Sequence, residues 1–252
     1  MLTADEVPVA AGVPLWEVPG WFDRYGVTAG ITGRGTDPGA PFDLGLWTEN
    51  PVREVMERWR QFRAQFSSQQ SFVMSHQVHG DRVQWHECDR PGWTILEGAD
   101  GHGTTLPGCL LLVTVADCVP VYLVAPRRRA VALLHAGWRG TAAGIVARGA
   151  DLLRERAGVP ASELVMHVGI GICGRCYEVG SEVMAAMGRA AAGPGPWHLD
   201  LRSVLQEQAD LLGVEAVTVS SRCTACDRGQ FFSHRGSGGR DGRMVAYLGW
   251  PA

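Results

Sequence analysis

Residues 110–140 read LLLVTVADCVPVYLVAPRRRAVALLHAGWRG, and this stretch decides the fold class. It holds three short apolar runs, rich in Val and Leu, at residues 110–115, 119–124 and 130–134. Short continuous apolar runs bounded by turn residues are typical of strands that are buried on both faces. The three arginines at 127–129 indicate a turn between the second and third runs. We therefore expect neighbouring buried strands at the centre of the protein.

Helix and strand signals flank this stretch without a regular βαβ alternation. Asn50 followed by Pro51 is typical of a helix N-cap, and apolar residues at helical spacing follow it to residue 66. Further helices are predicted over residues 142–157, 178–192 and 202–212, and further strands over 74–83 (with a turn), 164–170, 216–220 and 244–248. This mixture predicts the α/β (or α+β) class, with a mixed β-sheet core flanked by helices.

The chain shows no sign of division into domains. Residues 1–50 are rich in Gly and Pro and lack strong periodicity, and Gly33, Gly35, Pro38 and Gly39 predict a loop. No internal repeat and no long polar linker follows. Residues 1–252 are therefore expected to form a single domain with a Gly/Pro-rich N-terminal segment at about 1–50.

Composition excludes several classes of partner. With 46% hydrophobic and 19% charged residues the chain can bury a sizeable core. A net charge of −3 gives no electrostatic reason to expect a nucleic acid partner. Residues 110–125, the best apolar stretch, contain Thr114 and Asp117 and fall short of the about 20 residues that a membrane span takes. No basic start with an apolar run precedes residue 11, which argues against a secretory signal.

The cysteines indicate a reducing compartment. There are seven: Cys88, Cys109, Cys118, Cys173, Cys176, Cys223 and Cys226. An odd number in a chain of this size favours a cytoplasmic protein, with some thiols reserved for metal binding or catalysis.

His79, Cys118 and His135 are the candidate chemical centre. Cys118 and His135 lie at equivalent ends of neighbouring apolar runs, so a hairpin-like arrangement could bring them together. Two imidazoles and a thiolate are good Zn²⁺ ligands, and three protein ligands leave a fourth position for water or substrate. The wide spacing also allows simple packing, or a metal-free thiol hydrolase in which His135 activates Cys118. His76 is left out of the metal site, because residues three apart on a strand point to opposite faces.

Four blocks of sequence resemble the bacterial laccase-domain family. They are QVHG at 77–80, ADG at 99–101, TVADCVP at 114–120 and HAGWRG at 135–140. Members of this family were once called polyphenol oxidases and are now regarded as purine nucleoside phosphorylases. The resemblance extends from about Gly30 to the last residues. Cys173 replaces a common glycine, and His234 stands where the family usually has tyrosine.

The resemblance implies a zinc site built from His79, Cys118 and His135, and a laccase-domain-family fold. It also implies phosphorolysis of adenosine, inosine and 5′-methylthioadenosine, together with hydrolytic deamination of adenosine. Deamination needs an activated water at the purine C6. Phosphorolysis needs phosphate held against the ribose, which a cationic clamp suits. Purine nucleosides and phosphate are thus the expected small-molecule partners.

Other residues near these blocks have two or more interpretations. Asp117 could act as a general base, orient a ligand imidazole, or cap the following turn. Arg139 and Arg34 could bind phosphate or a substrate hydroxyl, or form structural ion pairs. Asp100 with Gly101 is expected to form a turn.

Two alternatives to a zinc phosphorylase follow from the same residues. One is the thiol hydrolase built on Cys118 and His135. The other is a copper-dependent polyphenol oxidase, since Cu²⁺ outcompetes Zn²⁺ at most nitrogen and sulfur sites. The eight histidines include no His-x-His pair, so the several copper centres of true laccases cannot be built in that way.

Two C-x₂-C pairs, Cys173/Cys176 and Cys223/Cys226, form a separate signal. They could make a structural Cys₄ zinc site or redox pairs. Their separation exceeds that of compact zinc ribbons, and the resemblance accounts for Cys176 and Cys223 singly.

Overall fold

The computed structural model describes residues 2–48, 50–87 and 90–252, so Cys88 lies outside the described residues. The strands are β1 (Leu2–Thr3), β2 (Val7–Val9), β3 (Leu15–Glu17), β4 (Thr28–Thr32), β5 (Ser71–His76), β6 (Val83–His86), β7 (Gly92–Glu97), β8 (Gly101–Thr104), β9 (Cys109–Val115), β10 (Val119–Ala125), β11 (Ala130–Ala136), β12 (Val165–Val168), β13 (Glu178–Val179), β14 (Trp197–His198), β15 (Ala216–Val219) and β16 (Met244–Gly249). The helices are α1 (Trp21–Tyr25), α2 (Val52–Ala64), α3 (Trp138–Ala142), α4 (Ile145–Ala157), α5 (Ser181–Ala186) and α6 (Leu201–Leu212).

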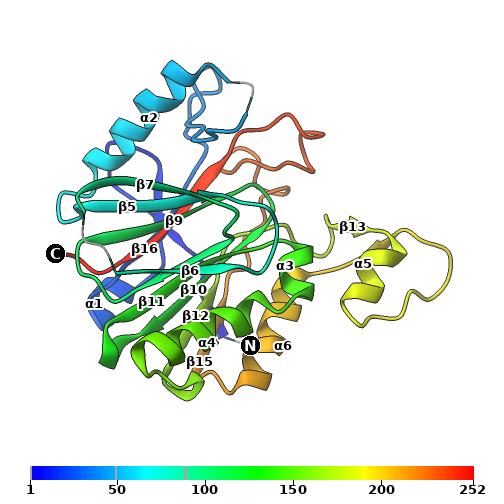
Figure 1. Cartoon of the computed structure of the whole chain (residues 1–252). Helices are drawn as coiled ribbons and strands as arrows, with labels where there is room; N and C mark the ends of the chain where they lie inside the picture. Colours follow the sequence, from blue (N-terminus) through cyan, green and yellow to red (C-terminus); the bar gives the residue numbers. More distant parts are fainter. Residues whose placement is uncertain (1, 49, 88–89) are drawn as a thin grey trace.

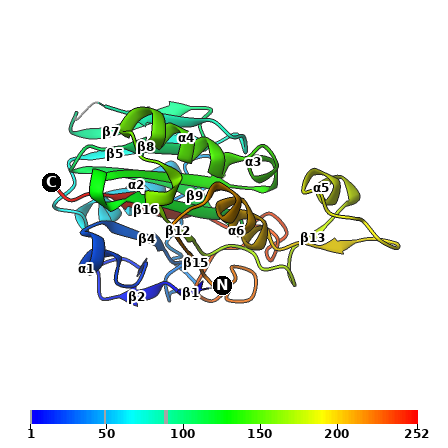
Figure 2. The ribbon, with the colours of Figure 1, turned by 90° about the horizontal axis from the view of Figure 1, so that it is seen from below.

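Two mixed seven-stranded sheets make up the body of the molecule. Their strand orders are β1-β15-β12-β10-β11-β8-β6 and β2-β3-β4-β16-β9-β5-β7. Parallel and antiparallel pairs occur in both, for example β10 against β11 antiparallel and β5 against β9 parallel. Helices α4 and α6 cover the first sheet, and α2 covers the second (Figures 1 and 2). The predicted mixed α/β class is confirmed, with the core divided between two sheets.

Alternation along the central strands explains this layering. In β10, Val121 and Leu123 belong to the core under α4 and α6, whereas Tyr122 and Val124 belong to the core between the sheets. In β9 the odd-numbered residues from Cys109 to Val115 face that same inter-sheet core. Leu110 and Leu112, which alternate with them, face α2. Both faces of each strand are therefore covered, which is why these segments are continuously apolar.

The three predicted central strands are confirmed, and the chain changes sheets between them. β9 lies in the second sheet, while β10 and β11 pair in the first. The crossing point is the short link at residues 116–118. This link places Cys118 where the two sheets meet.

Two predicted helix boundaries were wrong. The helix predicted over 178–192 is replaced by β13, a short α5 and irregular chain, because Gly180 precedes α5 and Gly188 adopts a left-handed φ of 63° after it. The helix predicted from residue 142 instead starts at Ile145, after a break at Gly144 with φ 80°.

One prediction for the first 66 residues also needs correction. Asn50 is not the N-cap of α2: the N-cap is Pro51, and the Asn50 amide instead donates to Asp43 and to Thr48 Oγ1. The loop predicted from Gly33, Gly35, Pro38 and Gly39 is confirmed, since residues 33–48 follow β4 without helix or strand, whereas β1–β4 and α1 occupy much of residues 2–32. Strands of two to five residues are too short to show a periodicity.

The described helices are too short for a bilayer. The longest, α2 and α4, have 13 residues each, and none of the helices in the described ranges could span a membrane.

Candidate functional site

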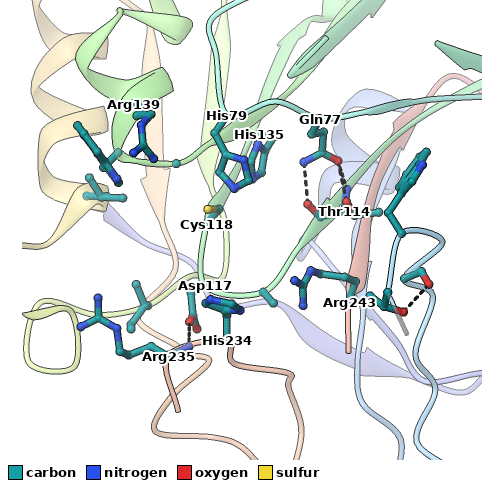
Figure 3. Close-up of a pocket in the computed structure, with 18 of the residues that line it drawn as sticks. Gln77, His79, Thr114, Asp117, Cys118, His135, Arg139, His234, Arg235 and Arg243 are labelled. Atoms are coloured by element: carbon teal, nitrogen blue, oxygen red, sulfur yellow. Dashed lines mark hydrogen bonds between the residues drawn. The ribbon is translucent and has the colours of Figure 1, made fainter. Parts of the chain in front are cut away.

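Three chain segments bring His79, Cys118 and His135 together. Cys118 directly precedes β10, and His135 on β11 is paired with Pro120 of β10, so the strand pairing sets these two residues side by side. His79 comes from the loop between β5 and β6. One donor atom from each of the three side chains lies within 4.8 Å of the others (Figure 3). The rings of His79 and His135 are 4.9 Å apart, centroid to centroid.

Asp100 holds two of these residues in place. Its carboxylate is fully buried and accepts hydrogen bonds from the backbone N–H groups of His79 (2.9 Å) and Gly80 (2.8 Å), and a longer one from Val78 (3.2 Å). It also accepts a 2.9 Å hydrogen bond from His135 Nδ1. An imidazole that donates from Nδ1 leaves its Nε2 lone pair free for a metal, as in the carboxylate–histidine–metal arrangement. Asp100 therefore fixes the His79 loop and the tautomer of His135.

This role of Asp100 was missed in the sequence, where Asp100-Gly101 indicated only a turn. Burial alone raises the pKa of the Asp100 carboxyl, but its hydrogen bonds with His135, Gly80 and Val78 lower it below the usual value. The carboxylate thus stays charged opposite the imidazole.

Unusual backbone conformations surround the cluster. His79 and Asp117 adopt positive φ angles of 61° and 85°, a region that costs a non-glycine residue about 1–3 kcal/mol. Gly140 allows close approach: a Cβ there would lie 2.6 Å from the Gly80 carbonyl oxygen. The loop that carries His79 is therefore pressed against α3. Strain of this kind persists where the surrounding structure imposes it, and it concentrates at functional sites.

The cluster also polarises its own thiol. Burial raises the pKa of Cys118, but the neighbouring His135 and His79 more than offset this and lower it to about 6. Burial lowers the pKa of His135, whereas Cys118 and Asp100 raise it to about 9. In the metal-free protein, Cys118 and His135 thus favour each other's charged forms, a thiolate–imidazolium pair. A thiolate is the form of cysteine that binds metal.

Asp117 is engaged away from the imidazoles. Its carboxylate accepts hydrogen bonds from Thr224 Oγ1 (2.5 Å), Ser233 Oγ (2.7 Å) and the backbone N–H of Arg235 (2.6 Å). One role considered for Asp117 was to orient a ligand imidazole. In the structure it is Asp100 that hydrogen-bonds the His135 imidazole. Asp117 ties the link before Cys118 to two loops near the end of the chain.

A cavity of about 450 Å³ opens over the cluster. Side chains from both sheets and from the late loops line it: Gly45, Leu46, Trp47, Thr48, His76, Gln77, His79, Thr114, Ala116, Asp117, Cys118, His135, Gly137, Trp138, Arg139, Ile172, Tyr177, Leu201, His234, Arg235 and Arg243. Figure 3 shows Arg139 and Arg235 on one side of the cluster and Arg243 on the other. The cavity is within the about 300–1,000 Å³ typical of small-molecule sites.

The cavity is cationic. Arg139, Arg235 and Arg243 all line it, while the one lining carboxylate among the described residues, Asp117, is already hydrogen-bonded. The Arg139 guanidinium lies 4.3 Å from the Trp138 ring centroid. Within the described parts of the chain it forms no ion pair. The Arg235 guanidinium donates to the Glu178 carbonyl at 2.7 Å.

Arg34 does not line this cavity. Its guanidinium forms a 2.7 Å ion pair with Asp241 and lies over the Phe232 ring. Asp241 in turn accepts from the Ser233 N–H, and Ser233 donates to Asp117. Of the two roles considered for Arg34, the geometry matches the structural ion pair.

Sequence reasoning also passed over several lining residues. Gln77 bridges to β9, since its side chain accepts from the N–H of Thr114 (2.7 Å) and donates to the Thr114 carbonyl (2.9 Å). His76, predicted to lie outside the metal site, stacks on Trp47 with ring centroids 4.8 Å apart and is indeed not part of the donor cluster. Arg235 and Arg243 carry no local signal of function. Their place in the cavity depends on contacts more than 100 residues apart, such as Arg243 N–H to Asp43.

The three donors fit a soft or borderline divalent metal. Two imidazole nitrogens and one thiolate suit Zn²⁺. His135 is held as a ligand by Asp100, and Gly137 leaves room beside the sulfur, because a Cβ there would lie 3.2 Å from Cys118 Sγ. Since the cluster faces the cavity, a fourth coordination position would be open to substrate or water.

Comparisons with known proteins agree with this geometry. Residues 24–251 match the family described as multi-copper polyphenol oxidoreductase laccase. The chain is 33% identical to purine nucleoside phosphorylase YlmD of Geobacillus stearothermophilus (89% of this chain, 90% of that one) and 33% identical to a purine nucleoside phosphorylase of Deinococcus radiodurans (96% and 95%). A shorter match, 36% identical over 59% of this chain and 61% of the relative, is to adenosine deaminase RL5 of an unknown prokaryotic organism.

Solved structures share the fold. The crystal structure of YlmD from Geobacillus stearothermophilus superposes with a TM-score of 0.87 at 30% identity, covering 98% of this chain and 100% of that one. That of Bacillus licheniformis YfiH gives 0.84 at 28% identity, covering 93% and 96%. With nearly its whole length matched, the chain belongs to the laccase-domain family, the one described as multi-copper polyphenol oxidoreductase laccase.

Proposed function

We propose that this protein is a zinc-dependent purine nucleoside phosphorylase. It would act on adenosine, inosine and 5′-methylthioadenosine, and would also deaminate adenosine. One observation carries the proposal: a three-donor His/Cys/His cluster faces a cavity with a cationic rim. The purine nucleoside phosphorylases that match over most of the chain support the same assignment.

His79, Cys118 and His135 would hold the zinc ion. Zinc bound with three protein ligands supplies a Lewis acid and lowers the pKa of water at its open position. Asp100 contributes by keeping His135 in the ligating tautomer and by keeping the His79 loop in place. Asp117 is a positioning residue, because it fastens the link before Cys118 to the loops at Thr224 and Ser233.

The cationic rim would bind phosphate. In phosphorolysis a phosphate oxygen forms a bond to the ribose anomeric carbon, the bond from that carbon to purine N9 breaks, and the purine leaves with the bonding electrons and takes up a proton. Arg139 and Arg243 offer N–H donors from opposite sides of the cavity. Guanidinium groups bind phosphate oxygens through paired, charge-assisted hydrogen bonds. They would hold the nucleophile and offset its charge.

Aromatic side chains would bind the nucleoside. Trp47, Trp138 and Tyr177 line the cavity, and a ring face that His76, Arg139 or Arg235 leaves uncovered would stack on the purine. The pKa of Tyr177 is raised to about 12, chiefly by burial and then by the nearby Cys118. Its hydroxyl therefore stays protonated at neutral pH and can donate a hydrogen bond to a substrate oxygen or nitrogen.

Product analysis with and without phosphate tests the proposal. Purified zinc-loaded protein is incubated with adenosine, inosine and 5′-methylthioadenosine, and the products are separated by chromatography. With phosphate, adenosine should give adenine and ribose 1-phosphate. Without phosphate, it should give inosine and ammonia. Absence of free base from every nucleoside in the presence of phosphate would overturn the phosphorylase assignment.

The thiolate–imidazolium pair of Cys118 and His135 favours one competing function, a thiol hydrolase without metal. Its signature would be full activity in chelator-treated protein, abolished by iodoacetamide. The copper alternative would show instead as oxidation of phenols that depends on added copper. Zinc-dependent nucleoside cleavage, without activity in chelator-treated protein and without copper-dependent phenol oxidation, rejects both the thiol hydrolase and the copper oxidase.

A further inference from the structure

A second group of metal-ligand residues lies outside the cavity. Cys173 and Cys176 follow β12, and Cys223 and Cys226 follow β15. Their four Sγ atoms all lie within 4.8 Å of one another. Of the described residues that line the cavity, none is one of these four cysteines.

The backbone brings the two C-x₂-C segments together. Gly171 and Cys223 form a parallel β-bridge, and the Thr224 N–H donates to the Gly171 carbonyl at 3.2 Å. Each segment then turns tightly: Tyr177 N–H donates to the Cys173 carbonyl, and Asp227 N–H donates to the Cys223 carbonyl, both at 2.9 Å. Two similar turns thus face each other, each presenting two sulfurs.

The surroundings suit thiolates. The Cys173 backbone N–H points at Cys223 Sγ, 3.2 Å away. The Arg202 guanidinium lies close by, since it donates to the Asp200 carboxylate (2.8 Å) and to the carbonyl of Arg222 (2.9 Å), the residue before Cys223. A backbone N–H and a nearby guanidinium therefore offer positive charge to the sulfur of Cys223.

We propose that Cys173, Cys176, Cys223 and Cys226 bind a zinc ion as a closed, structural tetrathiolate site. Zinc–sulfur bonds of about 2.3 Å in a tetrahedron place sulfurs about 3.8 Å apart. The Sγ atoms of Cys176 and Cys226 are 3.5 Å apart, so little movement would be needed. Binding would release the remaining thiol protons to solvent. Four protein ligands leave no position for substrate, which makes the role structural.

The site would fasten a projecting arm to the active-site loops. The arm, residues 174–200, contains β13, α5 and β14 and stands away from the body of the molecule (Figures 1 and 2). Ile172 N–H donates to the Asp117 carbonyl at 2.9 Å, and Thr224 donates to the Asp117 carboxylate. Both segments that carry the cysteines thus contact Asp117, next to Cys118.

Zinc stoichiometry tests this directly. Protein purified with added zinc and gel-filtered into metal-free buffer should hold two zinc ions per chain. Cys226→Ser should hold one zinc ion, because the four-cysteine site is lost. Cys118→Ala should also hold one, because the zinc ion at His79, Cys118 and His135 is lost. Cys109→Ala, at a buried core cysteine outside both clusters, should keep two. A wild-type content of one that Cys226→Ser leaves unchanged would overturn the proposal, and so would iron in place of zinc.

Cobalt spectroscopy identifies the ligands. In Cys118→Ala loaded with Co²⁺, the remaining ion should show the strong sulfur charge-transfer and tetrahedral d–d bands of a tetrathiolate, and Cys226→Ser should lose them. Cys226 is exposed, so serine there is compatible with folding, which circular dichroism checks. A Cys176–Cys226 disulfide found by mass spectrometry under non-reducing conditions in freshly purified protein would contradict the proposal. Nucleoside activity does not enter either readout, so this test can fail independently of the proposed function.

Discussion

The two metal-ligand clusters of this protein differ in the ways that separate catalytic from structural sites. His79, Cys118 and His135 supply three donors and face a cavity of about 450 Å³. The four-cysteine cluster supplies four donors and is packed against Ile172, Tyr177 and Ala225. An open coordination position permits chemistry, whereas a full set of thiolates only holds segments together.

The comparison also shows how differently the two clusters are specified. The four cysteines come in two local C-x₂-C turns, so each half of the cluster is formed by neighbours in sequence. The open cluster takes one residue from each of three segments and needs Asp100 to orient two of them. Substitutions in the open cluster should therefore affect activity most.

The largest effect is expected from Cys118→Ala. Loss of one of its three ligands should remove the zinc ion from the open cluster. Substitution of a residue that only hydrogen-bonds a metal ligand typically costs about 10–100-fold, so kcat/KM for phosphorolysis should fall by more than that. The measurement pairs initial rates with zinc analysis. Cys226→Ser is the matched control, because it also removes a thiolate but leaves the open cluster intact. Equal losses of activity in the two variants would abolish the distinction between the clusters.

Asp100→Asn should follow. An asparagine amide presents one oxygen and an NH₂ group to donors that now share a carboxylate, so at least one backbone N–H or His135 Nδ1 loses its acceptor. Zinc affinity at the open cluster should fall about 10–100-fold, and the free energy of unfolding by about 1–3 kcal/mol. Competition with a chelator measures the zinc affinity, and unfolding in denaturant measures the free energy of unfolding.

Asp81→Asn is the control for Asp100, because its carboxylate lies in the loop that carries His79 and makes an exposed 3.0 Å ion pair with Arg148. It should change stability by less than about 0.5 kcal/mol. If Asp100→Asn keeps wild-type zinc affinity, Asp100 does not orient the ligands.

Arg139→Gln should have a smaller and more selective effect. Removal of one charge-assisted hydrogen bond, worth about 1.5–3 kcal/mol, should raise the KM for phosphate by about 10-fold or more, while phosphate-independent deamination keeps its rate. Arg148→Gln, in an exposed ion pair, is the control. A uniform fall of both activities would place Arg139 in a general structural role instead.

The smallest effect concerns only the metal-free protein. Because the pKa of Cys118 is lowered to about 6, its thiolate should be present above that pH and lost as the pH falls below it. Alkylation of Cys118, followed by peptide mass spectrometry, should therefore rise with a midpoint near pH 6. Cys109, whose burial raises its pKa to about 12, should stay unmodified. A midpoint near pH 9 would show that His135 and His79 do not stabilise the thiolate. As a control, added zinc should block alkylation of Cys118.

Sequence predicted the parts of the fold that depend on local pattern. The three buried strands around Cys118 follow from short apolar runs, and their pairing was enough to set Cys118 beside His135. The helix predicted over 202–212 is confirmed as α6: Gly213 ends it with φ 74°, as predicted, and the structure adds Asp200 as its N-cap. The helix predicted over 178–192 failed because apolar spacing outweighed the glycines at 180 and 188 in the prediction.

The remaining features depend on long-range contacts. Nothing local shows that β9 and β10 lie in different sheets, or that Asp100 points at the His79 loop rather than forming a simple turn. His79 was chosen through the family resemblance, since its spacing from Cys118 carries no signal. Arg235 and Arg243 reach the cavity only through loops that fold back on Asp117 and Asp43.

Stepwise removal of zinc tests most directly the claim that the open cluster carries the chemistry. The wild-type protein is titrated with a chelator, and both phosphorolysis of adenosine and zinc per chain are measured at each step. We predict that activity disappears while one zinc ion per chain remains, and that one added equivalent restores it. Full activity in protein that holds only the tetrathiolate zinc, or no zinc at all, would contradict the account.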